Sequence, residues 1–183
     1  MTPEIPMNGL TLILGGARSG KSSFAEKMAR ESGKPVLFIA TATAGDVEMT
    51  ERIRNHQASR PPGWQTLELP CGLGRKLAQP VAEVVIVDCI TLLVSNILLS
   101  FPENTPAEDV MHHIKAEVDE LISAQARLGG QWLIVSNEVG LGLVPPYPLG
   151  RVYRDALGFA NQTLAREACR VIFMVAGIPM VIK

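Results

Sequence analysis

The chain has 183 residues, of which 47% are hydrophobic, and its 17 Lys and Arg residues against 18 Asp and Glu residues give a formal net charge of -1. This size and apolar content predict one domain, residues 1–183, with a sizeable core and a loose leader at 1–9. The near-neutral charge argues against a general affinity for nucleic acid.

Targeting and redox signals are weak in this sequence. The N-terminus lacks the basic and apolar segments of a signal peptide, and no apolar run approaches the roughly 20 residues needed to span a bilayer. Cys71, Cys89 and Cys169 are odd in number and widely spaced, which argues against a disulfide framework or a zinc site. We therefore expect a cytoplasmic protein whose cysteines pack as small hydrophobic side chains.

The first apolar run, Leu10–Leu14, is typical of a buried parallel strand, and Ser22–Arg30 has helix-forming residues with an apolar face. The residues between them complete the phosphate-binding pattern G-x-x-x-x-G-K-S: Gly15-Gly16-Ala17-Arg18-Ser19-Gly20-Lys21-Ser22. Backbone amides of such a loop and the positive end of the helix bind phosphate. Lys21 is expected to reach the β- and γ-phosphates, and the Ser22 hydroxyl is expected to bind Mg²⁺.

Further strands and helices follow along the chain. Val36–Ala40 is predicted as a second buried strand, a helix is expected at about 48–57, and Trp64–Leu69 alternates as a short strand does. The sequence allows a short helix at 73–78. The β-branched run Val84-Val85-Ile86-Val87 is predicted as a further buried strand. It ends in Asp88, at the position where P-loop enzymes place an acidic residue near Mg²⁺.

The second half of the chain continues the alternation of helices and strands. Helices are predicted over 91–99, 107–128 and 149–168, strands over 132–136 and 171–175, and a short edge strand over 180–183 after a turn at 177–179. This order predicts an α/β fold with a mostly parallel sheet, helices on both faces and a C-terminal edge hairpin.

Several stretches beyond the phosphate-binding loop match one known family. They are Ile39-Ala40-Thr41, Glu48-Met49, Arg52-Ile53, His56, Arg60-Pro61, Asp88-Cys89-Ile90-Thr91 and Ser136-Asn137-Glu138-Val139-Gly140. The sequence resembles the bifunctional adenosylcobinamide kinase/adenosylcobinamide-phosphate guanylyltransferases of cobalamin biosynthesis from Leu10 to Lys183. The resemblance implies a P-loop, RecA-like sheet and a homotrimer with sites at subunit boundaries.

The resemblance also implies two reactions that use ATP and GTP as substrates and Mg²⁺ as cofactor. A nucleoside triphosphate phosphorylates the aminopropanol hydroxyl of adenosylcobinamide. GTP then guanylylates a histidine, which corresponds to His56, and adenosylcobinamide phosphate takes the GMP to give adenosylcobinamide-GDP.

The nucleotide contacts that the resemblance implies are Gly15, Gly16, Ala17, Arg18, Ser19, Gly20, Lys21, Ser22, Ala40, Thr41, Ala42, Gln57, Ala58, Ser59, Arg60, Glu68 and Asp88. The implied metal ligands are Ser22 and Asp88. Relatives can carry Glu in place of Asp88, so the shorter carboxylate is expected to bind Mg²⁺ directly or through a water molecule.

The residues alone leave the role of His56 open. A neutral imidazole is nucleophilic near pH 7 and can attack an α-phosphorus, whereas a surface histidine on a polar helix is more often inert. A helix packed back along the sheet would also carry His56 away from the phosphates by about 1.5 Å per residue. Because the apolar stripe of this segment is thin, we expect an exposed, mobile helix at 47–58 that projects from the strand ends.

Other charged residues also have two interpretations. Arg18 contacts phosphate or is solvated, and Glu138 touches metal or substrate or caps a backbone amide. Arg151 and Arg154 meet substrate phosphate or a subunit partner, while His112 and His113 are expected on a solvated helix face. Two other functions remain open: a single-activity small-molecule kinase in which His56 is incidental, and a nucleotide switch, against which the lack of an N-K-x-D segment argues.

Overall fold

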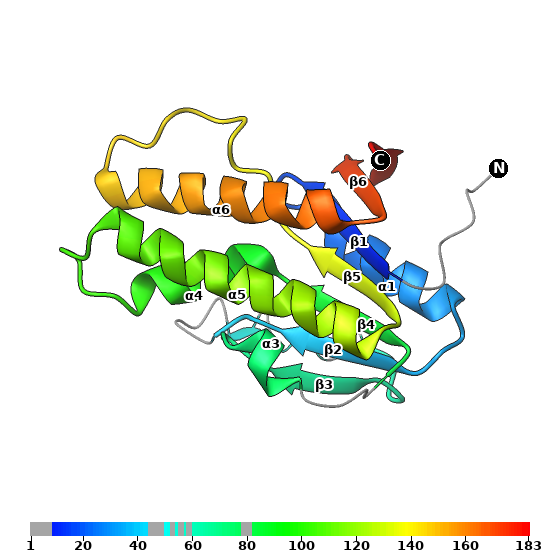
Figure 1. Cartoon of the computed structure of the whole chain (residues 1–183). Coiled ribbons are helices and arrows are strands. Elements are labelled where there is room, and N and C mark those ends of the chain that lie inside the picture. Colours follow the sequence, from blue (N-terminus) through cyan, green and yellow to red (C-terminus); the bar gives the residue numbers. More distant parts are fainter. Residues whose placement is uncertain (1–8, 44–49, 52–53, 55–56, 58–59, 78–81) are drawn as a thin grey trace.

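The computed structural model describes residues 9–43, 50, 51, 54, 57, 60–77 and 82–183, and these form a seven-stranded sheet in the order β3-β2-β4-β5-β1-β6-β7 (Figure 1). The strands are β1 (Gly9–Gly15), β2 (Val36–Ala40), β3 (Gln65–Glu68), β4 (Val84–Asp88), β5 (Gln131–Val135), β6 (Arg170–Val175) and β7 (Ile178–Val181). All neighbouring strands are parallel except β6 and β7. The carboxyl ends of six strands therefore meet at one edge of the sheet, where such folds bind their ligands.

Helices cover both faces of the sheet (Figure 1). They are α1 (Lys21–Glu31), α3 (Leu73–Lys76), α4 (Ile90–Leu99), α5 (Ala107–Leu128) and α6 (Pro148–Glu167). In the described part of the chain, α1 covers one face and the other four helices lie on the opposite face. The predicted α/β architecture is confirmed, and most element ends differ from the prediction by only one or two residues.

The central strands are apolar throughout because each of them faces two cores. Leu37 and Ile39 of β2 pack into the core beneath α3–α6, whereas Val36 and Phe38 pack against α1. Side chains of successive strand residues point to opposite faces, so a strand covered on both sides lacks a polar face. The continuous hydrophobic runs that predicted buried strands follow from this arrangement.

Helix α5 packs on the sheet through a stripe of residues spaced three or four apart, including Val110, Ile114 and Val118. His112 and His113 lie outside this stripe and are exposed, as expected. None of the described helices combines the length and hydrophobicity of a membrane-spanning segment.

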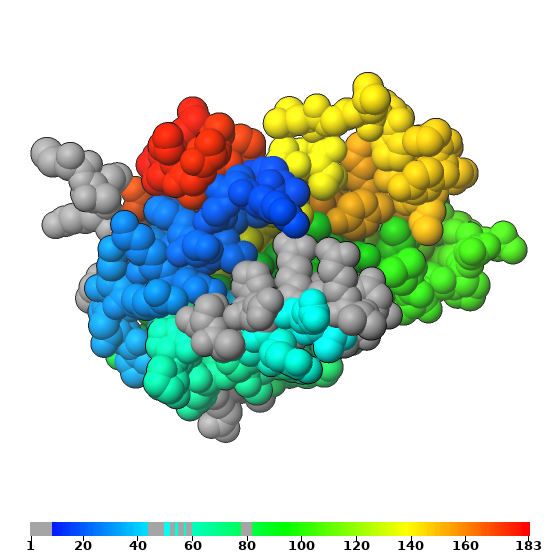
Figure 2. All heavy atoms as spheres, turned by 180° about the vertical axis from the view of Figure 1, so that it is seen from behind, coloured from blue at the N-terminus to red at the C-terminus, as the bar shows by residue number. Residues whose placement is uncertain are grey.

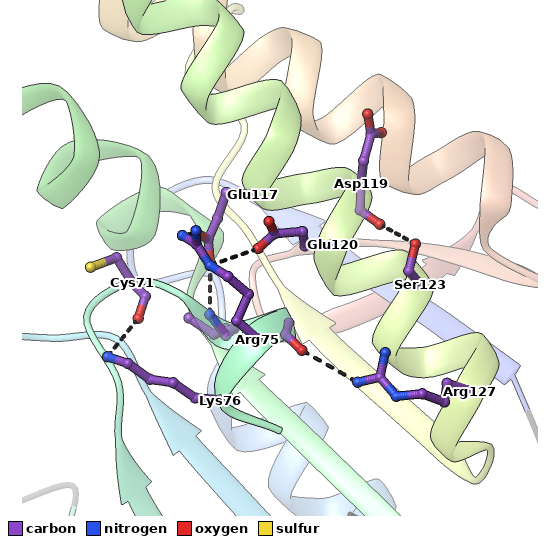
Figure 3. A network of polar contacts seen from close by, with 10 residues as sticks. Cys71, Arg75, Lys76, Glu117, Asp119, Glu120, Ser123 and Arg127 are labelled. Carbon is purple, nitrogen blue, oxygen red and sulfur yellow. Dashed lines mark hydrogen bonds and ion pairs between the residues drawn. The ribbon is translucent and has the colours of Figure 1, made fainter. Parts of the chain in front are cut away.

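The short helix α3 is held to α5 by the polar network in Figure 3. The buried Glu117 carboxylate accepts a hydrogen bond of 2.7 Å from the backbone amide of Leu73, the first residue of α3. At the other end of α3, Arg127 donates a hydrogen bond of 2.9 Å to the Leu77 carbonyl. Between these contacts, a Cβ atom added to Gly74 would lie 2.4 Å from the backbone carbonyl of Glu120, so only glycine allows this approach.

The C-terminal hairpin differs from its prediction. The turn is formed by Ala176 and Gly177, whose φ angles are 50° and 81°, and Pro179 lies within β7, opposite Met174. Two positive φ angles suit the tight turns whose twist matches antiparallel strands, and an edge strand tolerates proline. The expected turn at 177–179 is therefore wrong, although the edge hairpin itself is confirmed.

Two further expectations need correction. Cys71 and Cys169 are exposed, so only Cys89 packs against the core as a small hydrophobic residue. Gly9 already belongs to β1, which shortens the expected leader to residues 1–8, and these lie outside the described residues. The helix expected at 47–58 is described only at Thr50, Glu51, Arg54 and Gln57, which have helical backbone and are exposed.

Candidate active site

The loop between β1 and α1 has the backbone that a phosphate cradle requires. Gly15 and Gly20 have φ angles of 150° and 93°. A Cβ atom on Gly15 would lie 2.5 Å from the Met174 carbonyl oxygen, whereas one on Gly16 would meet no described residue within 4 Å. Arg18 also has a positive φ, 57°, in the middle of the turn. The loop therefore curls tightly at the carboxyl edge of the sheet before α1 begins.

The C-terminal hairpin supports this loop from the side. The backbone amide of Gly177 donates a hydrogen bond of 3.0 Å to the Ser19 carbonyl, and a Cβ atom on Gly20 would lie 3.3 Å from the Gly177 Cα. In Figure 2 the dark-blue N-terminal segment lies between the red C-terminal hairpin and the yellow segment that follows β5. The position of the phosphate loop is thus fixed by residues more than 150 positions away in the sequence.

Lys21 is held inside the loop. Its ammonium group donates a hydrogen bond of 2.6 Å to the Gly16 carbonyl and lies 3.5 Å from the Ser19 hydroxyl. The side chain is buried, with 7% of its surface exposed. An ammonium group in this position can neutralise the charge of phosphate groups that enter the loop.

A cleft of about 450 Å³ opens beside the loop. Residues from the loop, α1 and α4, and from the carboxyl ends of β2, β4 and β5, line it: Ala17, Arg18, Ser19, Gly20, Lys21, Ser22, Ser23, Ala40, Ala42, Arg60, Asp88, Cys89, Thr91, Leu92, Val135 and Asn137. The motif predicted from the sequence and the acidic residue at the end of β4 therefore share one cavity. This arrangement suits the binding of a nucleotide triphosphate tail.

Thr41 ties the ends of two strands together beneath the cleft. Its backbone amide donates to the Asp88 carbonyl at 3.0 Å, and its hydroxyl is 2.7 Å from both the backbone nitrogen and the carbonyl oxygen of Cys89. The Thr41 side chain is fully buried, whereas its neighbours Ala40 and Ala42 line the cleft. Thr41 thus holds Asp88 in position rather than forming the cavity wall.

The Cys89 thiol lines the cleft as a neutral group. Burial, together with the nearby Asp88 carboxylate, raises the pKa of Cys89 to about 11. The thiol is therefore protonated at neutral pH, and it is a poor nucleophile because reactivity belongs to the thiolate. Cys89 shapes the cavity but is not a candidate for covalent catalysis.

A second cavity of about 410 Å³ is lined by Gln57, Arg60, Pro61, Pro62, Trp64, Thr66 and Glu68. The Gln57 amide donates a hydrogen bond of 2.6 Å to the Glu68 carboxylate across it. Arg60 lines both cavities, and its guanidinium carbon lies 3.8 Å from the centre of the Phe38 ring. The two cavities are therefore neighbours that share one cationic side chain.

The environment of Arg60 is unusual for an arginine. Burial lowers the pKa of Arg60, and the carboxylates of Asp88, Glu26 and Glu68 oppose this effect. Its Nε atom is buried and has no hydrogen-bond partner among the residues that the structure describes. The guanidinium group nevertheless keeps its charge, so a cationic side chain lies at the junction of the two cavities.

The predicted site residues thus fall into several groups. The structure brings Ala17 to Ser22, Ala40, Ala42, Arg60 and Asp88 together around the cleft, while Gly15 and Gly16 shape the backbone of the loop. Gln57 and Glu68 line the second cavity. His56, Ala58 and Ser59 lie outside the described residues. The sequence did not predict that Cys89, Thr91 and Asn137 also line the cleft. Cys89 and Asn137 follow β4 and β5, and Thr91 lies in the first turn of α4, so their positions at the carboxyl ends of strands could have indicated it.

Three of the four charged residues whose roles the sequence left open, Glu138, Arg151 and Arg154, bond to other residues of this chain. The Glu138 carboxylate accepts a hydrogen bond of 2.6 Å from the Gly140 amide, which fits the capping alternative. Arg151 donates to the carbonyls of Pro145 and Pro146, and Arg154 pairs with Asp155. Arg18, in contrast, is exposed at the cleft, where it can meet phosphate.

Ser22 and Asp88 supply the oxygen atoms that Mg²⁺ prefers, and both residues are half-buried at the cleft. Among the residues that the structure describes, no three His, Cys, Asp or Glu side chains gather as a metal site. Magnesium sites in nucleotide enzymes use one or two protein ligands and take the remaining ligands from phosphates and water. The two residues therefore fit a Mg²⁺–nucleotide complex.

Comparison with known proteins gives a consistent result. The chain is 45% identical over 174 residues to the bifunctional adenosylcobalamin biosynthesis protein CobP of Pseudomonas aeruginosa, which covers 94% of this chain and 96% of that protein. It is 38% identical over 181 residues to the bifunctional adenosylcobalamin biosynthesis protein CobU of Escherichia coli, which covers 95% of this chain and 99% of that protein.

A solved structure shares the fold. The flagellar accessory protein FlaH from Methanocaldococcus jannaschii aligns with a TM-score of 0.55 and 14% identity, over 98% of this chain and 80% of FlaH. The predicted P-loop, RecA-like sheet is confirmed by this similarity and by the strand order. The family described as cobinamide kinase / cobinamide phosphate guanyltransferase matches residues 11–182. The chain belongs to this family.

Proposed function

We propose that this chain catalyses both reactions of its family, the phosphorylation of adenosylcobinamide and the transfer of GMP to adenosylcobinamide phosphate in cobalamin assembly. The observation that carries the proposal is the cleft in which Lys21 and Ser22 share one cavity with Asp88. Phosphoryl transfer depends mainly on positioning and on neutralising charge. A loop of backbone amides with a buried lysine supplies both.

In the kinase reaction, the aminopropanol hydroxyl of adenosylcobinamide attacks the γ-phosphorus of ATP or GTP. A new O–P bond forms, the bond between the γ-phosphorus and the β-γ bridging oxygen breaks, the nucleoside diphosphate leaves and the hydroxyl proton passes to water. Lys21 and the loop amides stabilise the negative charge of the transferred group. Mg²⁺ held by Ser22 and Asp88 would add further positive charge at the phosphates.

In the transferase reaction, a ring nitrogen of His56 attacks the α-phosphorus of GTP and pyrophosphate leaves. A phosphate oxygen of adenosylcobinamide phosphate then attacks the same phosphorus, the N–P bond breaks, and adenosylcobinamide-GDP is released with a free imidazole. The second cavity supports this step, because it adjoins the phosphate cleft and is lined by Gln57, next in sequence to His56. The side chain of Arg60 is available to both cavities.

GTP labelled at the α-phosphate tests the covalent step. Incubation is expected to leave label on the protein that is labile in acid and stable in alkali, as expected of a phosphoramidate. His56→Asn should lose the label while still binding GTP. His112→Asn, which changes an exposed histidine on α5, should keep it. Label that persists in His56→Asn would refute the role of His56. A wild-type protein that binds GTP but takes no label would favour the alternative, a single-activity kinase in which His56 is incidental.

We also propose a cytoplasmic homotrimer, as the family resemblance implies. The free, exposed thiols of Cys71 and Cys169 support a reducing compartment. Light scattering on the purified protein should give three times the mass of the 19.8 kDa chain. A monomer at micromolar concentration would contradict the assembly without touching the chemistry of the phosphate cleft.

A further inference from the structure

Asn137 occupies a special position at the floor of the cleft. It follows β5, the strand that lies between β1 with the phosphate loop and β4 with Asp88. The backbone hydrogen bonds between this segment and β1 continue on both sides of Asn137: the Ser136 amide donates to the Ile13 carbonyl at 3.0 Å, and the Glu138 amide donates to the Gly15 carbonyl at 3.1 Å. Asn137 therefore lies next to the first residue of the phosphate loop and lines the same cleft as Lys21.

The backbone of Asn137 is fixed from both sides. Its amide donates a hydrogen bond of 2.8 Å to the Thr91 hydroxyl of α4, and its carbonyl accepts one of 3.0 Å from the Asn161 amide of α6. Asn161 in turn accepts a hydrogen bond of 2.7 Å from the Ser136 hydroxyl. Thr91, Ser136 and Asn161 are all buried. A fully paired buried network of this kind holds a residue in one position.

A third contact reinforces the network. The Tyr153 hydroxyl of α6 lies 3.4 Å from the Thr91 carbonyl, and burial raises the pKa of Tyr153 to about 12, so this hydroxyl stays protonated. Two helices, α4 and α6, thus anchor the segment that leads out of β5. The sequence positions of these partners are far apart, which makes the arrangement a property of the fold.

The side chain of Asn137 is free to bind a ligand. Asn137 lines the cleft and is half-buried, and its side-chain amide makes no hydrogen bond to another described residue. A primary amide carries two N–H donors, and a donor that faces a cavity without a protein partner is available to whatever fills the cavity. The loop, Lys21 and Ser22 share this cavity, so the ligand group nearest to it is a phosphate.

We propose that the Asn137 amide donates a hydrogen bond to the terminal phosphate of the bound nucleoside triphosphate and stabilises it during phosphoryl transfer, with Asn161 as the positioning residue behind it. The inference rests on the proposed kinase function. In such a transfer, negative charge spreads over the equatorial oxygens of the transferred group. A donor that is already fixed in place stabilises this charge without reorganising.

Steady-state kinetics of adenosylcobinamide phosphorylation test the role of Asn137. Asn137→Ala is expected to lower kcat by about 100-fold, the usual effect of removing one preorganised donor. Asn137→Asp, which keeps the size but brings a carboxylate against the phosphate, should lower it at least as much. Binding of the nucleoside diphosphate, measured by calorimetry, should stay within about two-fold of wild type in Asn137→Ala, because the diphosphate lacks the group that Asn137 contacts.

The outcomes separate the two proposals. An inactive wild-type protein that binds nucleotide would refute the kinase function itself. An active wild type together with a wild-type kcat in Asn137→Ala would refute only the role of Asn137. An equal loss of affinity for diphosphate and triphosphate in Asn137→Ala would also refute it, since the residue would then merely support the loop.

The positioning role of Asn161 has its own test. Asn161→Asp keeps the oxygen that accepts from Ser136 and removes the amide that donates to Asn137. We expect kcat to fall by roughly ten-fold, with little change in KM. Combining it with Asn137→Ala should lower kcat no further than Asn137→Ala alone, because Asn161 acts through Asn137. A double variant whose loss of kcat equals the product of the two single losses would contradict a role of Asn161 through Asn137. The control is Gln162→Ala, at the exposed neighbouring residue on α6, whose kcat should match that of the wild type.

Discussion

The guanidinium carbon of Arg60 lies 3.8 Å from the ring centre of Phe38, a core residue of β2, so a charged side chain at the junction of two cavities is anchored on the hydrophobic sheet. Guanidinium groups stack on aromatic rings through both electrostatic and planar contact. The Nε atom of Arg60 is buried and has no hydrogen-bond partner among the described residues. Because Arg60 lines both cavities, its positive charge can attract an anionic ligand in either of them.

Arg60→Lys keeps the positive charge but loses the planar stacking and the forked donors. We expect the affinity for GTP to fall by roughly 10- to 100-fold, the range for losing a charge-assisted hydrogen bond. Isothermal titration calorimetry measures the change. Arg75→Lys, on the exposed side of α3, is the control and should bind GTP as wild type does. Equal affinities of Arg60→Lys and wild type would remove Arg60 from the site.

Lys21→Ala should abolish both reactions, because the phosphate charge in the shared cleft is no longer neutralised. Lys27→Ala serves as control, since Lys27 is an exposed residue of the same helix that forms only a surface ion pair with Glu31. Separate assays of phosphorylation and of GMP transfer distinguish the two activities. Wild-type GMP transfer by Lys21→Ala would show that the two reactions use different phosphate sites.

The contact between α3 and α5 predicts a difference between two glycines. Gly74→Ala places a methyl group 2.4 Å from the Glu120 backbone, so we expect the free energy of unfolding to fall by about 1–3 kcal/mol through overpacking. Gly158→Ala, within α6, places a methyl group that meets none of the described atoms within 4 Å, and it should raise the free energy of unfolding by about 0.5–1 kcal/mol. Urea denaturation followed by circular dichroism measures both. Similar stabilities of the two variants would contradict the close approach of α3 to α5.

The cysteines should differ in their reaction with iodoacetamide. Because burial and Asp88 raise the pKa of Cys89 to about 11, only about one in a thousand Cys89 side chains is a thiolate at pH 8. The exposed Cys71 and Cys169 should therefore be labelled first, and labelling of Cys89 should accelerate about ten-fold per pH unit between pH 8 and 10. Peptide mass spectrometry after timed quenching resolves the sites. Labelling of Cys89 as fast as Cys71 at pH 8 would contradict the neutral thiol.

Local sequence patterns predicted most of the fold because most elements carry their own signal. The strands β2, β4 and β5 are continuous apolar runs, α5 has a regular stripe of buried residues, and the glycine spacing marks the phosphate loop. The hairpin turn lies at Ala176 and Gly177 and not at 177–179, because Pro179, which usually indicates a turn, is paired with Met174 inside β7. Proline is compatible with the unpaired side of an edge strand, which the sequence alone does not reveal.

The candidate site was predicted only in part, because several of its contacts join distant segments. The loop and Asp88 follow from motif and strand end, but the stacking of Arg60 on Phe38 and the network that fixes Asn137 depend on how strands and helices assemble. The support of the Ser19 carbonyl by Gly177 likewise spans almost the whole chain. Such tertiary contacts leave no periodic signal in a single sequence.

The most direct measurement follows the fate of two labels of GTP in the presence of adenosylcobinamide. GTP labelled at the γ-phosphate should yield labelled adenosylcobinamide phosphate, and GTP labelled at the α-phosphate should yield labelled adenosylcobinamide-GDP, with both products absent in Lys21→Ala. Transfer of the γ-label alone, with the α-label recovered only as free guanine nucleotide, would contradict a single chain that performs both reactions.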